Sequence, residues 1–133
     1  MQQLRAELAE HTMYELLGGE PGIRRLVDAF YDHLAADVDL APIRVMHAED
    51  LSPMRQRLFE FLSGWLGGPP LFIQRTGSPC LTEAHAPYPI DRPAREQWLT
   101  CMERAMTDAK VADRYREALT PGFEGIADML TRA

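Results

Sequence analysis

The feature that most constrains the fold is a proline-rich stretch in the second half of the chain. Five prolines lie between Pro69 and Pro89, and Gly67-Gly68 precede them. Proline has no backbone N–H and fixes φ, so a stretch of this kind does not continue a regular helix. Structureless connections of such length are uncommon in compact domains and are usually functional. The sequence therefore predicts a functional connection that runs to about Pro93.

One histidine near the end of this connection is a candidate ligand. His85 begins the run His85-Ala86-Pro87-Tyr88-Pro89-Ile90, in which two prolines stiffen the backbone directly after it. An imidazole held rigidly against apolar helices is what a haem iron requires from its protein ligand. The alternative reading of His85 alone is a surface or capping histidine.

Capping and apolar spacing predict the first two helices of the chain. Thr12 and Glu15 have capping-box spacing, and they predict a very short helix that stops at Gly18-Gly19. After Pro21, one apolar stripe follows at spacings of three and four, which is typical of a helix with one buried face. Its members are Ile23, Leu26, Val27, Phe30, Tyr31 and Leu34. An irregular piece from about Asp37 to Asp50 then carries His47.

Three further helices are expected. Ser52-Pro53 has the residues of a helix cap and first position, and the helix after it should end at Gly67-Gly68. Another helix is expected to begin near Pro93, and the last near Ala112. A one-turn helix around residues 82–85 is plausible inside the connection. The apolar faces are Met54, Leu58, Phe61, Leu62 and Trp65, then Trp98, Leu99, Met102, Ala105 and Met106, and finally Phe123, Ile126, Ala127 and Leu130.

These patterns predict an all-α protein with about four substantial helices. No convincing period-two strand is present, and the helix connections are too irregular for a simple up-and-down bundle. The length of 133 residues suits one domain with one core. We therefore expect a single domain over residues 1–133, in which residues 1–11 form a polar N-terminal extension.

Charge and cysteine content exclude several classes of protein. The net charge is -6 and no Lys/Arg cluster stands out, which argues against nucleic acid or an anionic membrane as the main partner. No apolar run approaches the ~20 residues needed to span a bilayer, and the first residues lack a secretory apolar core. Cys80 and Cys101 lie in different segments, which favours free thiols in a cytoplasmic protein, with a disulfide between them as the alternative.

Several separated segments, in order, are similar to the truncated haemoglobins of group II. The resemblance covers Tyr14 to about Leu130. Its pieces are Tyr14 to Gly19, Phe30-Tyr31, Phe61, Trp65 to Pro69, His85 to Ile90 and Gln97 to Leu99. The resemblance implies a globin-like two-over-two helical sandwich around haem b.

The resemblance also implies roles for individual residues. His85 would be the iron ligand, and Tyr31 and Trp98 would be hydrogen-bond donors on the opposite face, which we call the ligand side. Donors of this kind stabilise the negative charge that dioxygen acquires at ferrous iron, without bringing a formal charge into the pocket. His47 is the best match for a third ligand-side position, as a donor, a water-mediated contact or a sixth iron ligand.

Each of these residues also has an ordinary structural reading. Tyr31 and Trp98 could be core aromatics, and His47 could be an exposed loop histidine. The expected haem wall would be apolar core under either reading; besides Trp98, its members are Leu58, Phe61, Leu62, Ile90 and Met102. The run before His85 lacks the basic residues common in the family, which leaves Arg75 as a candidate partner for a haem propionate. His11 and His33 are expected to be solvated.

Three functions are consistent with the sequence. The first is a haem protein that binds dioxygen and similar diatomic ligands such as nitric oxide or carbon monoxide. The second is a haem enzyme for nitric oxide dioxygenation or peroxidase-like chemistry, which would need an external reductase as a partner. The third is a haem-free helical interaction module, which leaves the combination of Tyr31, His85 and Trp98 unexplained.

Overall fold

Four long helices form where the apolar stripes predict them. The computed structural model describes residues 2–47, 49–77 and 90–131, and within these ranges it contains helices and no strand. None of the described helices combines the length and apolar character needed to cross a bilayer. The helices are α1 (Gln2–Glu10), α2 (Met13–Leu16), α3 (Gly19–Ala36), the short 3-10 helix η1 (Val38–Leu40), α4 (Ala41–Arg44), α5 (Ser52–Trp65), α6 (Leu71–Thr76), α8 (Arg92–Asp108) and α9 (Asp113–Leu130). The all-α prediction is confirmed.

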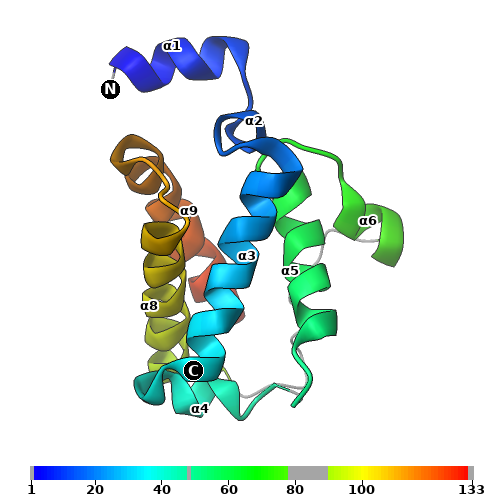
Figure 1. Cartoon of the computed structure of the whole chain (residues 1–133), viewed down its shortest axis with the longest axis vertical. Coiled ribbons are helices and arrows are strands. Elements are labelled where there is room, and N and C mark those ends of the chain that lie inside the picture. The colour runs from blue at the N-terminus through cyan, green and yellow to red at the C-terminus, as the bar shows by residue number, and fades with distance from the viewer. Residues whose placement is uncertain (1, 48, 78–89, 132–133) are drawn as a thin grey trace.

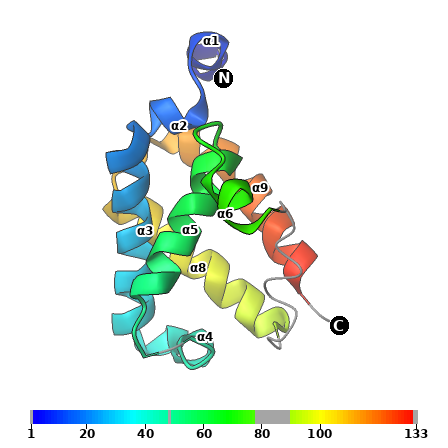
Figure 2. The same ribbon diagram turned by 90° about the vertical axis from the view of Figure 1, so that its right-hand side faces the viewer.

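The long helices are arranged as two packed pairs. Helix α3 packs most extensively against α8 and also against α5, while α8 packs against α9. Figures 1 and 2 show α3 beside α5 as one pair and α8 beside α9 as the other. The core lies between the pairs, and its largest buried side chains include Ile23, Leu26, Phe30, Leu34, Leu62, Met102 and Phe123.

The start of the predicted helical region follows the expected local chemistry. Thr12 accepts a hydrogen bond from the backbone N–H of Glu15, and the Glu15 carboxylate accepts one from the N–H of Thr12, which completes the capping box. Gly18 and Gly19 then take φ values of 103° and 64°, a left-handed conformation that glycine adopts without a steric penalty. This turn directs the chain from α2 into α3.

Two expectations about the middle of the chain are wrong. Ser52 does not cap α5; it is the first helical residue, and its own N–H donates to Asp50 Oδ1 at 3.0 Å. The piece between Asp37 and Asp50 is also more regular than expected, since it contains η1 and α4.

A further helix lies inside the predicted connection. Helix α6 forms because Phe72 is buried, with its ring 5.7 Å from that of Phe61, and the helix ends at Gly77 in a left-handed conformation. Its tertiary contact with α5 outweighs the many prolines around it. Residues 78–89, with the expected one-turn helix, lie outside the described residues.

The N-terminal extension is a helix that is tied to the rest of the molecule. Helix α1 has no buried residue, in keeping with a polar extension. Its Glu7 carboxylate accepts two hydrogen bonds from the Arg114 guanidinium, at 2.7 and 2.9 Å, and another from the Tyr115 hydroxyl. These hydrogen bonds, from Arg114 first, lower the pKa of Glu7 to about 2. The extension therefore docks on the start of α9 through charge rather than through a core.

A charged cluster fastens the end of α3 to α8, which corrects the expectation that His33 is solvated. The two ring nitrogens of His33 lie 2.7 Å from Asp37 and 2.5 Å from Asp108. Arg104 of α8 adds hydrogen bonds to Asp37 and, through two nitrogens, to Asp39. Both imidazole nitrogens can donate only when the ring is protonated, so the cluster favours the charged histidine.

The His33 cluster predicts a pH dependence of stability. Burial opposes the charged form, but hydrogen bonds to the two carboxylates outweigh it and raise the pKa of His33 above its ordinary value of 6.5. A raised pKa in the folded state gives stability that is complete below the unfolded value and is lost as pH rises through the folded value. We expect the unfolding free energy to fall as the pH rises above about 6.5 in urea titrations, and this fall to shrink in His33→Gln but not in His11→Gln. An unchanged pH profile in His33→Gln would show that the cluster contributes nothing.

Candidate functional site

Residues from α3, from α8 and from the segment after α4 bring the predicted ligand-side residues into one aromatic cluster. The Phe30 ring of α3 meets the Tyr31 ring edge to face, with centroids 5.0 Å apart, and lies 5.8 Å from the Trp98 ring of α8. His47, which follows α4, has its ring 6.2 Å from that of Tyr31. The residues lie far apart in sequence, yet the fold places them in one cluster.

Tyr31 is buried but keeps a hydroxyl that is available for donation. Its side chain is 6% exposed, and burial raises the pKa of Tyr31 above its ordinary value, so the O–H keeps its proton at neutral pH. Within the described part of the chain, the hydroxyl has no hydrogen-bond partner, and every fully enclosed side-chain N or O atom has one. The Tyr31 hydroxyl must therefore border accessible space.

Trp98 is a second available donor. Its side chain is half-buried against the core. Among the residues that the structure describes, its indole N–H has no acceptor either, so the same reasoning places this N–H at accessible space. Tyr31 and Trp98 thus provide two neutral donors whose rings both contact Phe30.

His47 is oriented by a backbone carbonyl. Its Nδ1 lies 2.8 Å from the carbonyl oxygen of Ile43. A carbonyl only accepts, so Nδ1 must carry the hydrogen, and in the neutral ring Nε2 then holds a lone pair. The geometry makes a neutral His47 an acceptor at Nε2, which differs from the predicted donor but is compatible with the water-mediated contact or the sixth iron ligand that the sequence also allowed.

The predicted haem wall separates into buried and half-buried side chains. Leu62 of α5 and Met102 of α8 are each 1% exposed. Leu58 and Phe61 of α5 and Ile90, just before α8, are only partly buried although they are apolar. Half-buried apolar residues of this kind form a surface that an apolar ligand can cover.

Aromatic contacts connect this wall to the ligand side. Phe61 stacks on Trp65 at 6.4 Å, and Trp65 lies 5.1 Å from Phe123 of α9. The Phe123 ring is in turn 5.9 Å from Trp98. Phe123 therefore joins the α5 wall to the tryptophan of the ligand side.

Arg55 fixes α5 against α3 close to Tyr31. Its two terminal nitrogens donate to Asp28 at 3.1 Å and Asp32 at 2.8 Å, one on each side of Tyr31 in the sequence. Its guanidinium carbon is 5.9 Å from the centre of the Tyr31 ring. The wall and the tyrosine are thus held together by charge as well as by packing.

Arg75 and Cys101, two other residues discussed from the sequence, are each hydrogen-bonded to another part of the protein. Arg75, the candidate for a haem propionate, is paired through Nε with Glu60 of α5. The Cys101 thiol is a buried free thiol that donates to the Phe30 carbonyl at 3.1 Å, and burial raises its pKa to about 12. Cys101 therefore stabilises the α3–α8 contact and is not a reactive nucleophile. Cys80 lies outside the described residues.

The predicted iron ligand His85 also lies outside the described residues. The structure describes the chain again from Ile90, and Asp91 then caps α8 by accepting a hydrogen bond from the Ala94 N–H at 2.9 Å. The role of His85 consequently remains a sequence prediction.

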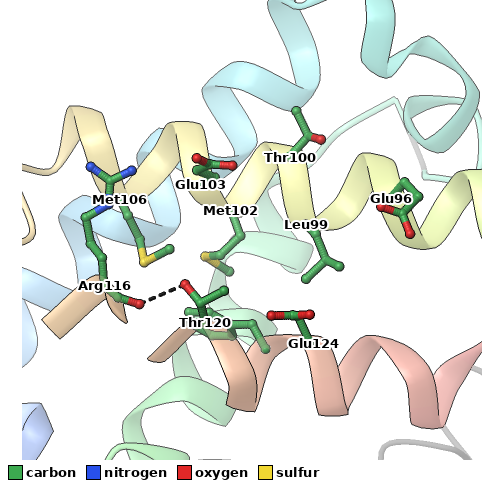
Figure 3. Close-up of a pocket in the computed structure, with 10 residues that line it drawn as sticks. Glu96, Leu99, Thr100, Met102, Glu103, Met106, Arg116, Thr120 and Glu124 are labelled. Carbon is green, nitrogen blue, oxygen red and sulfur yellow. Dashed lines mark hydrogen bonds between the residues drawn. The ribbon is translucent and has the colours of Figure 1, made fainter. Parts of the chain in front are cut away.

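A cavity between α8 and α9 borders this cluster at Phe123, which lines it. Figure 3 shows it lying between the two helices, with Leu99, Met102 and Met106 on α8 and three glutamates around it. Its volume is about 280 Å³, and its lining includes none of Tyr31, His47 and Trp98. Sites for drug-sized ligands usually occupy roughly 300–1,000 Å³, so the cavity is small for a porphyrin. Met102 is the one predicted wall residue that it shares.

Sequence reasoning missed the partners that orient His47. The Ile43 N–H donates to the side-chain oxygen of Gln97 at 3.2 Å, and the Ile43 carbonyl is the acceptor for His47. Gln97 is 54 positions from Ile43 in sequence. No local pattern signals a contact of this range; only the packing of α4 on α8 creates it.

Comparison with known proteins places the chain among globins. The family model of bacterial-like globins matches residues 12–131. The group 2 truncated hemoglobin YjbI of Bacillus subtilis is 37% identical over 106 residues, which are 80% of this chain and 77% of that protein.

Solved structures agree with this likeness. A cold-adapted truncated hemoglobin of Pseudoalteromonas haloplanktis is 40% identical with a TM-score of 0.89, over 92% of this chain and 99% of that one. A group II 2-on-2 hemoglobin of Agrobacterium tumefaciens is 32% identical with a TM-score of 0.88, over 92% and 95%. The two helix pairs described above correspond to this two-on-two arrangement.

Proposed function

The chain belongs to the bacterial-like globin family and is a haem globin that binds a small ligand, and from this we propose the residues that do the work. His85 would hold the iron, and Tyr31 and Trp98 would donate hydrogen bonds to a ligand bound there. His47 lies beside Tyr31 and sets the polarity there. The observation that carries the proposal is the aromatic cluster in which Tyr31 and Trp98 both contact Phe30 and His47 contacts Tyr31.

The described residues fit haem b. When bound, haem supplies a ferrous iron that takes dioxygen or a similar diatomic ligand. Leu58, Phe61 and Ile90 offer half-buried apolar surface to a flat apolar ring, and Leu62 and Met102 are buried in the core. The two donors border accessible space and can reach a polar ligand atom without competing partners in the described chain.

The ligand-side residues favour a polar diatomic ligand. Tyr31 is held in its protonated form by burial, so it donates and does not accept as an anion. Each buried hydrogen bond to a ligand contributes about 1–3 kcal/mol, and two of them would slow ligand release strongly. Dioxygen is the ligand that gains most from such donors, and we place nitric oxide and carbon monoxide in the same pocket.

A haem titration tests the proposal. The wild-type protein should take up one haem per chain and develop a sharp Soret band, in both the ferrous and the carbon monoxide forms. His85→Ala should lose this band or bind haem without a defined iron ligand, while His11→Ala, which alters an exposed histidine after α1, should behave as wild type. A wild-type chain that leaves added haem unbound, or a His85→Ala variant with an unaltered spectrum, would contradict the proposed roles.

A further inference from the structure

Both backbone polar groups of Ile43, its N–H and its carbonyl, are hydrogen-bonded to side chains of the ligand-side region. Its N–H donates to Oε1 of Gln97 at 3.2 Å, and its carbonyl accepts from Nδ1 of His47 at 2.8 Å. Its own side chain is 4% exposed and anchored in the core. Gln97 and His47, from different parts of the fold, therefore act on the same residue.

Helix α4 needs the contact with Gln97 because it cannot secure its own first turn. The first N–H groups of a helix have no acceptor within that helix. Leu40, which precedes α4, provides no side-chain cap, and Pro42 has no N–H. A helix of four residues is also far too short to be stable alone. The amide oxygen of Gln97, presented by α8, supplies the missing acceptor from outside.

We propose that Gln97 is a positioning residue for the ligand side, because by holding Ile43 it fixes the orientation and tautomer of His47. The proposal rests on the proposed function, in which His47 lies beside Tyr31 on the ligand side. The Ile43 carbonyl requires a hydrogen on Nδ1, so Nε2 of the neutral ring accepts. Donation to the ligand then falls to Tyr31 and Trp98. Gln97 and Trp98 are neighbours on α8. This one helix therefore carries the donor Trp98 and, through Gln97, orients the acceptor His47.

Two readouts that do not depend on activity test this role. The first is the histidine ring ¹H–¹⁵N spectrum of the ferrous carbon monoxide form, which reports the nitrogen of His47 that carries hydrogen. The second is the amide exchange rate of Ile43. Gln97→Leu removes the acceptor at similar size, Gln97→Glu keeps an acceptor oxygen at the same distance along the side chain, and Gln74→Leu alters an exposed glutamine on α6 as the matched control.

In wild type and in Gln74→Leu, His47 should carry its hydrogen on Nδ1. In Gln97→Leu, the Ile43 amide should exchange about tenfold faster, as expected for one lost hydrogen bond, and His47 should show a mixture of tautomers. Gln97→Glu should restore both readouts. If Gln97→Leu does not fold, Gln97→Asn, whose amide is one methylene too short, takes its place with the same expected result.

Unchanged exchange of Ile43 and an unchanged His47 tautomer in Gln97→Leu would overturn the positioning role. So would a failure of Gln97→Glu to restore them. Both readouts are repeated on the haem-free protein, so that the two proposals can fail separately. A wild-type chain without haem binding rejects the proposed function, whereas the Ile43 and His47 readouts decide the role of Gln97 in either state.

Discussion

Replacing Tyr31 with Phe is expected to speed dioxygen dissociation by about 5-fold to 150-fold, the equivalent of about 1–3 kcal/mol for a buried hydrogen bond. The Tyr31 ring is packed against Phe30 and His47, and phenylalanine keeps that packing while it removes only the hydroxyl. Because burial keeps the hydroxyl protonated, the lost group is a donor over the whole neutral pH range. Stopped-flow displacement of dioxygen by carbon monoxide measures the rate directly.

The matched control is Tyr14→Phe, which removes a tyrosine hydroxyl from α2, outside the ligand-side cluster. Its dissociation rate should equal that of wild type. Trp98→Phe should also speed dissociation, and a double-mutant cycle with Tyr31→Phe should show coupling, since both rings contact Phe30. A Tyr31→Phe rate within twofold of wild type would remove Tyr31 from the proposed ligand contact.

Replacing Phe123 with Ala is expected to lower the free energy of unfolding by about 3–5 kcal/mol. Phe123 is 1% exposed, and its ring contacts Trp65 of α5 and Trp98 of α8. Truncation would leave a cavity where three helices meet, and neither indole can fill it without leaving its own contacts. Urea denaturation of the haem-loaded protein, followed by circular dichroism, measures the loss.

Met129→Ala provides the control on the same helix, because Met129 is 55% exposed. Its effect should stay within about 0.5 kcal/mol, as for most surface substitutions. A Phe123→Ala variant that loses less than about 1 kcal/mol would mean that α9 is not fixed to the core through this ring.

Local chemistry explains the parts of the fold that the sequence predicted. The stripes of α3, α5, α8 and α9 are long and periodic, so their buried faces, including Phe30 and Phe123, were predictable from spacing. The capping box at Thr12 and the left-handed glycines before α3 depend on only a few neighbouring residues. The likeness to truncated haemoglobins then supplied the roles of Tyr31, His47 and Trp98, which no spacing could give.

The parts that were not predicted depend on distant contacts. Helix α6 forms because Phe72 packs on Phe61, against the bias of the surrounding prolines. The charged form of His33 is favoured because Asp108, 75 positions away, is hydrogen-bonded to its second nitrogen in addition to Asp37 at the first. The His47 ring is hydrogen-bonded to the carbonyl of Ile43, and the N–H of Ile43 donates to Gln97, 54 positions away. In each case the deciding partner is remote in sequence, so local patterns carry no signal for it.

The infrared C–O stretch of the ferrous carbon monoxide form tests the ligand-side assignment most directly. A donor close to the ligand oxygen increases back-donation from iron into the C–O antibonding orbitals. This weakens the C–O bond and lowers its stretching frequency. We predict a low-frequency band in wild type that moves to higher frequency in Tyr31→Phe and in Trp98→Phe. Bands at the wild-type position in both variants would show that neither donor faces the ligand.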